Sequence, residues 1–225
     1  MSLLKELQHI TERTYQQGSG INLEKFVIGR QRFWDLHRQS AETSRELSDI
    51  ARTFFRVTGN RLYLAIYYSD QMIKSLERHD PRRGVNEKNI FPFIVFIEEL
   101  NHAIHGALKF LSGERNLQRE DFIRDLELLS KIDSYFTLKF FVAYFNRSKQ
   151  LEQWDRLWLR HHLFEQWDYD YTDHSLRDRY LETNTLGEKY TRFLDGLESR
   201  QRVTEIRKFR GMTYPRKRQY ILMLP

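Results

Sequence analysis

The chain has 225 residues, of which 30% are charged and 14% are aromatic, and its formal net charge is +6. It contains no cysteine, which excludes disulfides, thiolate metal sites and cysteine nucleophiles. A chain of this length can bury one large core. No cluster of Pro, Gly and Ser marks an internal boundary, so we expect a single domain.

The N-terminal segment predicts a cytoplasmic protein. It becomes charged at Lys5 without developing the apolar core of a signal peptide. No apolar run reaches the roughly 18 residues that a membrane-spanning helix needs, so we also expect no transmembrane segment.

Apolar residues recur at helical spacing through most of the chain. After Asn22, a good N-cap, the spacing predicts a long helix that ends in the high forties. Residues 62–76 form another apolar helical face, although the turn residues at 58–60 allow a short β-hairpin at 54–68 instead. Continuous apolarity on both sides of this turn and few β-branched residues favour the helix.

Later in the chain the same periodicity predicts helices at 89–111, 119–147 and 151–170, and a last long one from 173 to 197. The connections between these later helices are short, which favours antiparallel neighbours. The sequence therefore predicts an all-α fold, a single-domain bundle of about six or seven antiparallel helices.

The helix at 89–111 carries the clearest chemical signal. Glu98, Glu99, His102 and His105 interrupt an otherwise apolar segment, and three of them share one stripe of the helix. A carboxylate three or four residues before an imidazole can hold a divalent metal ion or form an acid–base pair. The same stripe is also typical of the solvent-facing side of an amphipathic helix, so both interpretations stay open.

Within this stripe, the sequence from Glu99 to His102 resembles the Glu-x-x-His element of ferritin-like di-iron carboxylate proteins, which build their site inside a four-helix bundle. No second Glu-x-x-His follows residue 102, so the family is not assigned. The chain also lacks the zincin motif His-Glu-x-x-His, a Walker A loop, Gly-x-Gly-x-x-Gly and a nucleophile elbow.

A second constellation lies on the helix at 151–170, where Trp154, Trp158, His161 and Glu165 share a stripe inside the apolar arc. A buried imidazole and carboxylate one turn apart must satisfy each other or a third group. They are therefore either a structural pair in a Trp-lined core or ligands that complete a site with the helix at 89–111.

The positive charge is concentrated at residues 200–225, which carry +7 and leave −1 on the rest of the chain. We treat residues 1–199 as a helical core domain and residues 200–225 as a basic segment that packs on it or extends from it. Cations and aromatic residues alternate in this segment, as in surfaces that bind phosphates and bases. The residues expected to contact an anion or nucleic acid are Arg207, Lys208, Arg210, Arg216, Lys217 and Arg218.

Two functional hypotheses follow. In the first, the protein has a Glu/His pocket for a divalent metal or for acid–base chemistry, with a carboxylate as general base toward a metal-bound water. Its ligands would be Glu98, Glu99, His102, His105, His161 and Glu165. In the second, the protein is a non-catalytic interaction module that binds nucleic acid or an acidic partner through its basic C-terminus.

Overall fold

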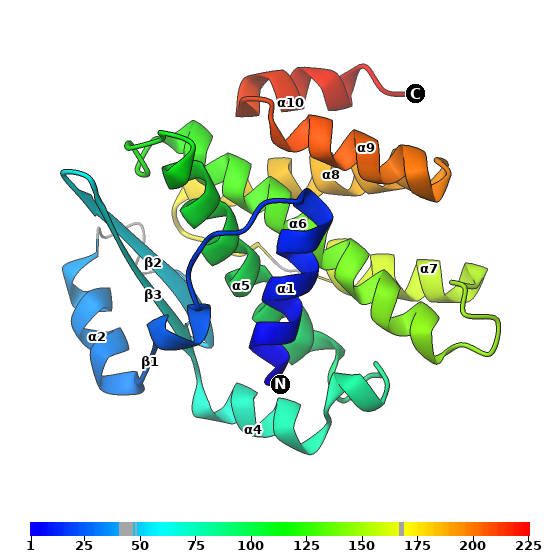
Figure 1. The fold of residues 1–225 in the computed structure, drawn as a ribbon, viewed down its shortest axis with the longest axis horizontal. Coiled ribbons are helices and arrows are strands. Elements are labelled where there is room, and N and C mark those ends of the chain that lie inside the picture. The colour runs from blue at the N-terminus through cyan, green and yellow to red at the C-terminus, as the bar shows by residue number, and fades with distance from the viewer. Residues whose placement is uncertain (41–46, 48, 167–168) are drawn as a thin grey trace.

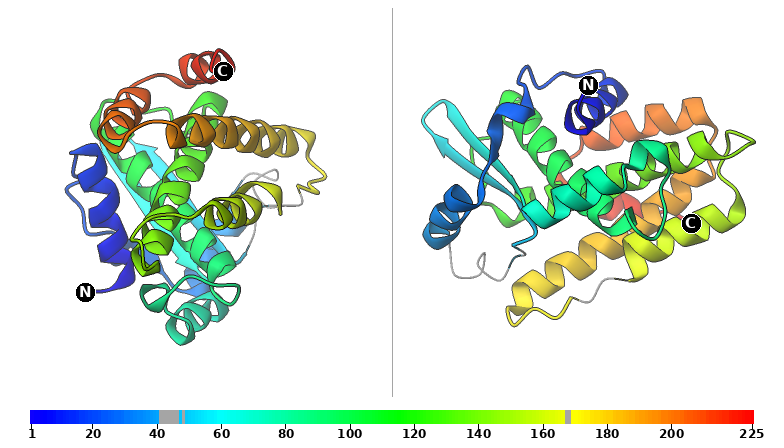
Figure 2. Two further views of the ribbon diagram at one scale, coloured as in Figure 1. Left: turned by 90° about the vertical axis from the view of Figure 1, so that its right-hand side faces the viewer. Right: turned by 90° about the horizontal axis from the view of Figure 1, so that it is seen from below.

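The computed structural model describes residues 1–40, 47, 49–166 and 169–225. These residues form nine α-helices and a small three-stranded sheet, which lies at one side of the helices (Figures 1 and 2). The predicted helical class is confirmed for most of the chain, and the sheet is an addition to it. Among the described residues, no helix combines the length and the apolarity needed to cross a membrane.

The N-terminal part differs from the long helix predicted after Asn22. It consists of helix α1 (Leu3–Tyr15), a 3-10 turn η1 (Leu23–Phe26), strand β1 (Val27–Ile28) and helix α2 (Arg30–Gln39). The prediction is wrong at 27–28 because β1 pairs in parallel with a strand far along the chain, with Val27 opposite Ile66. Residues 41–46 and 48 of the predicted helix lie outside the described residues.

The segment at 54–68 is a hairpin and not the preferred helix. Strands β2 (Ala51–Thr58) and β3 (Arg61–Tyr68) pair antiparallel along their whole length. Gly59 takes a φ of +57° in the two-residue turn, a backbone conformation that glycine adopts without strain. Aromatic residues are good strand formers, and five of them lie on these strands, so the low count of β-branched residues was a poor guide. Only the end of the predicted helix is helical, as α4 (Asp70–Arg78).

The next two helices form the centre of the molecule. After a short 3-10 turn η2 (Pro81–Arg83) come α5 (Ile90–Leu111) and α6 (Glu120–Phe145), close to the predicted bounds. Glu98 on α5 lies beside Lys131 on α6, and His102 lies beside Glu127, so the two helices run in opposite directions. The apolar residues of α5 from Phe93 to Leu108 lie in the main hydrophobic core, whereas Phe91 and Leu111 at its ends are exposed.

The described residues that follow α6 form further helices. These are α7 (Gln153–Arg160), a π-helical turn η3 (His161–Glu165), α8 (His174–Asp195), α9 (Ser199–Arg210) and α10 (Tyr214–Leu222). Ile206, Phe209 and Ile221 of the basic segment enter a second core cluster with residues of α6 and α8. Figure 1 shows α9 and α10 stacked against one end of α8 and α6, with the C-terminus at that end.

Candidate functional site

The polar stripe of α5 does not face solvent, because α6 covers it with polar residues of its own. Lys131 Nζ lies 2.7 Å from Glu98 Oε1, and the Ser130 hydroxyl donates a hydrogen bond of 3.0 Å to the Glu98 carbonyl. Strand β2 reaches the same turn of α5, where the Thr53 hydroxyl donates to the Glu99 carbonyl at 2.9 Å. Polar groups from three elements therefore converge on one turn of α5.

His102 lies between two carboxylates. Its Nδ1 is 3.6 Å from Glu99 Oε2, and its Nε2 is 3.3 Å from Glu127 Oε2. Burial alone lowers the pKa of His102, but Glu127 and Glu99 raise it by more, so the pKa lies well above its usual value. Burial acts to raise the pKa of Glu127, but His102 and Lys131 lower it. The imidazolium of His102 and the carboxylate of Glu127 are therefore charged together at neutral pH.

We call Glu98, Glu99, His102, Glu127 and Lys131 the α5–α6 cluster. Its ionisable side chains are close to the surface without being free in water: the exposed fraction is 16% for Glu98, 17% for Glu99, 14% for His102 and 13% for Glu127. A small part of each of these side chains is therefore in contact with solvent.

Tyrosines border the α5–α6 cluster on the side of α8. The Tyr180 hydroxyl lies 3.4 Å from Glu127 Oε1, and the Tyr180 ring stacks on Tyr169 and Tyr171. Burial raises the pKa of Tyr180 well above its usual value, and Glu127 raises it further, so this hydroxyl stays protonated at neutral pH.

The cluster holds more hydrogen-bonding capacity than the protein itself uses. Four buried polar atoms at this place have no partner of good hydrogen-bond geometry in the described part of the chain: Glu98 Oε1, Glu99 Oε2, His102 Nε2 and Tyr169 OH. Three of these atoms lie within ion-pair distance of an oppositely charged group: Glu98 Oε1 near Lys131, Glu99 Oε2 near His102 Nδ1, and His102 Nε2 near Glu127. Buried polar atoms without a well-formed hydrogen bond are rare in proteins, so their occurrence together makes the cluster a candidate site.

His105 belongs to a different group. Its Nε2 lies 2.6 Å from Asp133 Oδ2, and the Tyr15 hydroxyl donates to Asp133 Oδ1 at 2.6 Å. The side chain is fully buried, and burial lowers the pKa of His105 by more than Asp133 raises it. His105 is therefore neutral and donates its Nε2 proton to Asp133. Through Asp133 it connects α5 to α6 and to Tyr15 of α1, and it does not belong to the group around His102.

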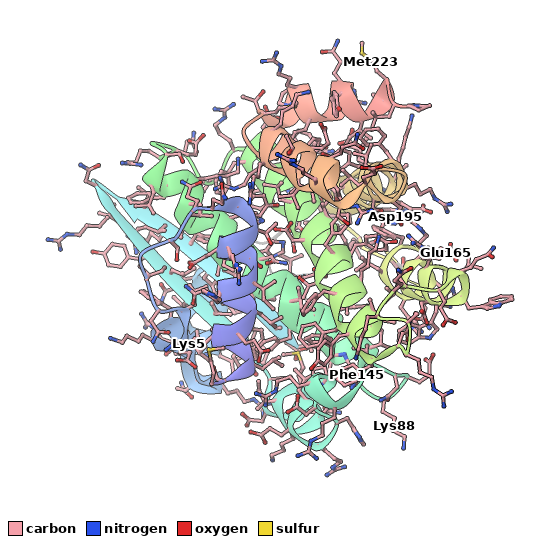
Figure 3. All side chains as sticks on the ribbon, turned by 45° about the vertical axis from the view of Figure 1, so that its right-hand side comes forward. Lys5, Lys88, Phe145, Glu165, Asp195 and Met223 are labelled. Carbon is pink, nitrogen blue, oxygen red and sulfur yellow. The ribbon has the colours of Figure 1, made fainter. Side chains whose placement is uncertain are left out.

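His161 and Glu165 also lie apart from the α5–α6 cluster. Their side chains are 3.3 Å apart, but they are 53% and 54% exposed, so the prediction of a buried pair is wrong. The buried face of this segment is formed by Leu159, His162 and Leu163, whereas Trp154, which the stripe assigned to the core, is 80% exposed. Figure 3 shows Glu165 on the outer side of its helical turn.

The six predicted ligands thus occupy three places. Glu98, Glu99 and His102 are together, His105 faces α1, and His161 and Glu165 are on the surface at η3. Across the ranges that the structure describes, no group of three or more His, Cys, Asp or Glu side chains is arranged to hold a metal ion.

The basic C-terminal residues are largely occupied within the protein. Arg207 donates to the Thr14 carbonyl, Arg210 to Gln17, Lys217 to Asp125 and Arg218 to Glu182, at 2.6 to 2.7 Å. The other two predicted contacts, Lys208 and Arg216, are exposed. Binding of nucleic acid by this segment stays a prediction, and its cations would first have to leave these partners.

Glu127 and Lys131 are the members of the cluster that sequence reasoning missed. They lie on α6 one helical turn apart, inside a segment chosen for its apolar spacing. The signal that could have found them is the row of polar residues Glu127, Ser130, Lys131 and Ser134, which matches the polar stripe of α5 in length.

Comparison of the chain with protein-family models, with curated proteins and with solved structures gives no match at any of these three levels.

Proposed function

We propose that the α5–α6 cluster is an acid–base site that binds a small cationic ligand, with His102 as the group that exchanges a proton. The observation that carries this proposal is the position of His102, which has a carboxylate beside each ring nitrogen and still keeps 14% of its side chain exposed. An imidazole in this setting can act as a general acid near neutral pH.

The charges of the cluster select the kind of ligand. Glu98, Glu99 and Glu127 contribute three negative charges, and protonated His102 and Lys131 contribute two positive charges, which leaves −1. A small cation such as an alkylammonium or a guanidinium is therefore attracted, and the neighbouring tyrosine rings add favourable cation–π surface.

Cation binding and proton release are coupled in this proposal. The His102 pKa is high because two carboxylates face the ring. A cation that pairs with one of these carboxylates weakens their attraction to the imidazolium and lowers the His102 pKa, so a proton is released to solvent.

The test is a pH titration of the histidine rings by NMR, on protein labelled with 15N-histidine, with and without methylammonium or methylguanidinium. We expect the pKa of His102 to lie well above the usual histidine value and to shift downward with either cation but not with acetate. Glu127→Gln should lower the His102 pKa. The matched control Glu165→Gln, which removes a carboxylate beside another histidine, should leave it unchanged.

Ordinary titration of His102 in the wild type, or equal responses to cations and acetate, would contradict the proposal. The same titration with Zn²⁺ or Mn²⁺ examines metal binding. A metal ion bound by Glu99, His102 and Glu127 would require side-chain movement, because the two carboxylates lie beside opposite ring nitrogens. Stoichiometric Zn²⁺ binding that Glu127→Gln abolishes would replace the acid–base proposal with a metal site.

A further inference from the structure

A second charged cluster lies around Asp195, the last residue of α8, far from the α5–α6 cluster in the sequence. Lys139 Nζ lies 2.5 Å from Asp195 Oδ1, and Arg160 Nη2 lies 2.8 Å from Asp195 Oδ2. Arg156 Nη1 lies 3.5 Å from Asp195 Oδ1, and the Tyr135 hydroxyl donates a hydrogen bond of 2.5 Å to Asp195 Oδ2. Both oxygens of one carboxylate are therefore surrounded by donors from α6 and α7.

A fourth cation completes the group. Arg202 of α9 donates to the carbonyls of Leu194 and Leu197 at the end of α8, at 2.8 and 2.6 Å. Its guanidinium lies 5.9 Å from the centre of the Phe136 ring, and Lys139 Nζ lies 5.7 Å from the same ring. Arg202 is thus a neighbour of Lys139, and four helices contribute to the site.

We call Lys139, Arg156, Arg160, Arg202 and Asp195 the Asp195 cluster. Three cations lie against one carboxylate, and Arg202 lies near enough to Lys139 to lower its pKa, so the five residues together carry a net charge of +3. Lys139 and Arg160 are 13% and 7% exposed, so their charges are poorly screened, whereas Arg156 is 38% exposed and lies at the open side. Figure 3 shows Asp195 where α8 and α9 approach α7.

The cations of the cluster keep donors that Asp195 does not use. In the described ranges, the ammonium of Lys139 has one hydrogen-bond acceptor, Asp195, although it can donate three hydrogen bonds. The only acceptor near the Arg156 guanidinium there is Asp195 Oδ1, at 3.5 Å, which is too long for a strong hydrogen bond. Both side chains can therefore turn donors toward a second acceptor at the exposed edge.

We propose that the Asp195 cluster is a binding site for a multiply charged oxyanion, a phosphate or pyrophosphate group, with Arg156 and Lys139 as its main contacts. Arginine and lysine at short range from each other form the usual protein site for phosphate groups, because their donors match its oxygens and their charges balance its own. Asp195 occupies part of this site as an internal anion and holds Lys139, Arg156 and Arg160 together when no ligand is bound.

The test is calorimetric titration with inorganic phosphate and with pyrophosphate, at constant ionic strength set with chloride. Wild-type protein should bind pyrophosphate saturably at one site and more tightly than phosphate. Arg156→Ala should weaken binding roughly tenfold or more, since it removes a charge-assisted contact. The matched control Arg177→Ala removes an exposed arginine of α8 outside the cluster and should leave the affinity unchanged.

Asp195→Asn separates a ligand site from a purely structural ion network. Loss of the carboxylate leaves four cations unbalanced, so the variant should melt at a lower temperature than the wild type and should bind pyrophosphate more tightly. Pyrophosphate should then restore more of its melting temperature than it adds to the wild type. If the variant does not fold, Arg156→Ala and Arg177→Ala still decide the question. Absence of saturable binding to the wild type, or equal weakening by the two arginine variants, would overturn the proposal.

Discussion

Gly106 is a residue of α5 against which the Phe55 ring of β2 packs closely. A Cβ atom at this position would lie 2.3 Å from Cε1 of the Phe55 ring, far inside van der Waals contact. Gly106→Ala should gain about 1 kcal/mol of helix propensity, but displacement of Phe55 should cost roughly 1–3 kcal/mol. We expect the cost of displacing Phe55 to exceed the gain in helix propensity, so the free energy of unfolding measured by chemical denaturation should fall by about 1 kcal/mol.

The sign of the effect should reverse when the ring is absent. A Phe55→Ala background removes this clash, because the three atoms nearest to the added Cβ all belong to the Phe55 ring. Gly106→Ala should then stabilise the protein by the helix-propensity gain alone. Destabilisation in both backgrounds would show that Phe55 is not the obstacle.

His102 gives a pH dependence of stability that can be assigned to one residue. Its folded pKa lies above its usual value, so the pairing with Glu99 and Glu127 stabilises the fold fully below the unfolded pKa, about 6.5. This contribution is lost as the pH rises through the folded pKa. His102→Gln should therefore lower the unfolding free energy by roughly 2 kcal/mol or more at pH 6, and by less in alkaline solution.

The exposed His174, at the start of α8, provides the control. His174→Gln should change the unfolding free energy little at any pH. A loss for His102→Gln that is equal at pH 6 and in alkaline solution would mean that packing of the ring, and not its charge, stabilises this region.

At the scale of the elements, the sequence predicts what depends on local spacing. The bounds of α5, α6 and α8 follow from apolar periodicity and agree with the structure within a few residues. Strand β1 could not be predicted from local spacing, because Val27 and Ile28 are strand residues only through their pairing with Ile66 and Tyr67. No local pattern carries that information, since the partners are separated by the whole of α2 and β2.

The candidate site could also be predicted only in its local part, because contacts between distant segments leave no local pattern in the sequence. Glu98, Glu99 and His102 are recognisable on one helix, but their partners Glu127 and Lys131 become evident only when α6 is placed across α5. The error at His161 has a different origin. The segment from Trp154 to Glu165 has apolar residues on two sides, and the side with Trp154 faces outward, whereas Trp158 packs partly against the core.

At the scale of the whole molecule, buried ion pairs connect the helices to one another. Lys131 joins α6 to α5, Arg160 joins α7 to α8, and Lys217 joins α10 to α6. Such pairs contribute little net stability, because desolvation of the charges offsets their attraction. Each pair nevertheless penalises any other arrangement, since a shifted helix would leave a buried charge without its partner. We infer that they fix which helices are neighbours, while the two apolar clusters supply the stability.

Lys217 is the most deeply buried of these charges and gives the last prediction. Its ammonium is 0% exposed, lies 2.6 Å from Asp125 Oδ1 and holds α10 against α6. Burial lowers its pKa from 10.5 to about 8. Between these two pH values the unfolded chain keeps the proton that the folded protein has lost, so the contribution of Lys217 to stability rises with pH across that interval.

Lys217→Met removes this titration and leaves Asp125 paired with Lys109, so no carboxylate is stranded. The unfolding free energy of the wild type relative to Lys217→Met should therefore rise between pH 7 and pH 10, by up to about 3 kcal/mol if the whole shift is expressed. Lys88→Met, at the surface in Figure 3, controls for general effects of alkaline pH and should show no such rise. A relative stability that falls over this range would mean that the ion pair with Asp125 outweighs the desolvation of Lys217, and that α10 is held to the core by charge.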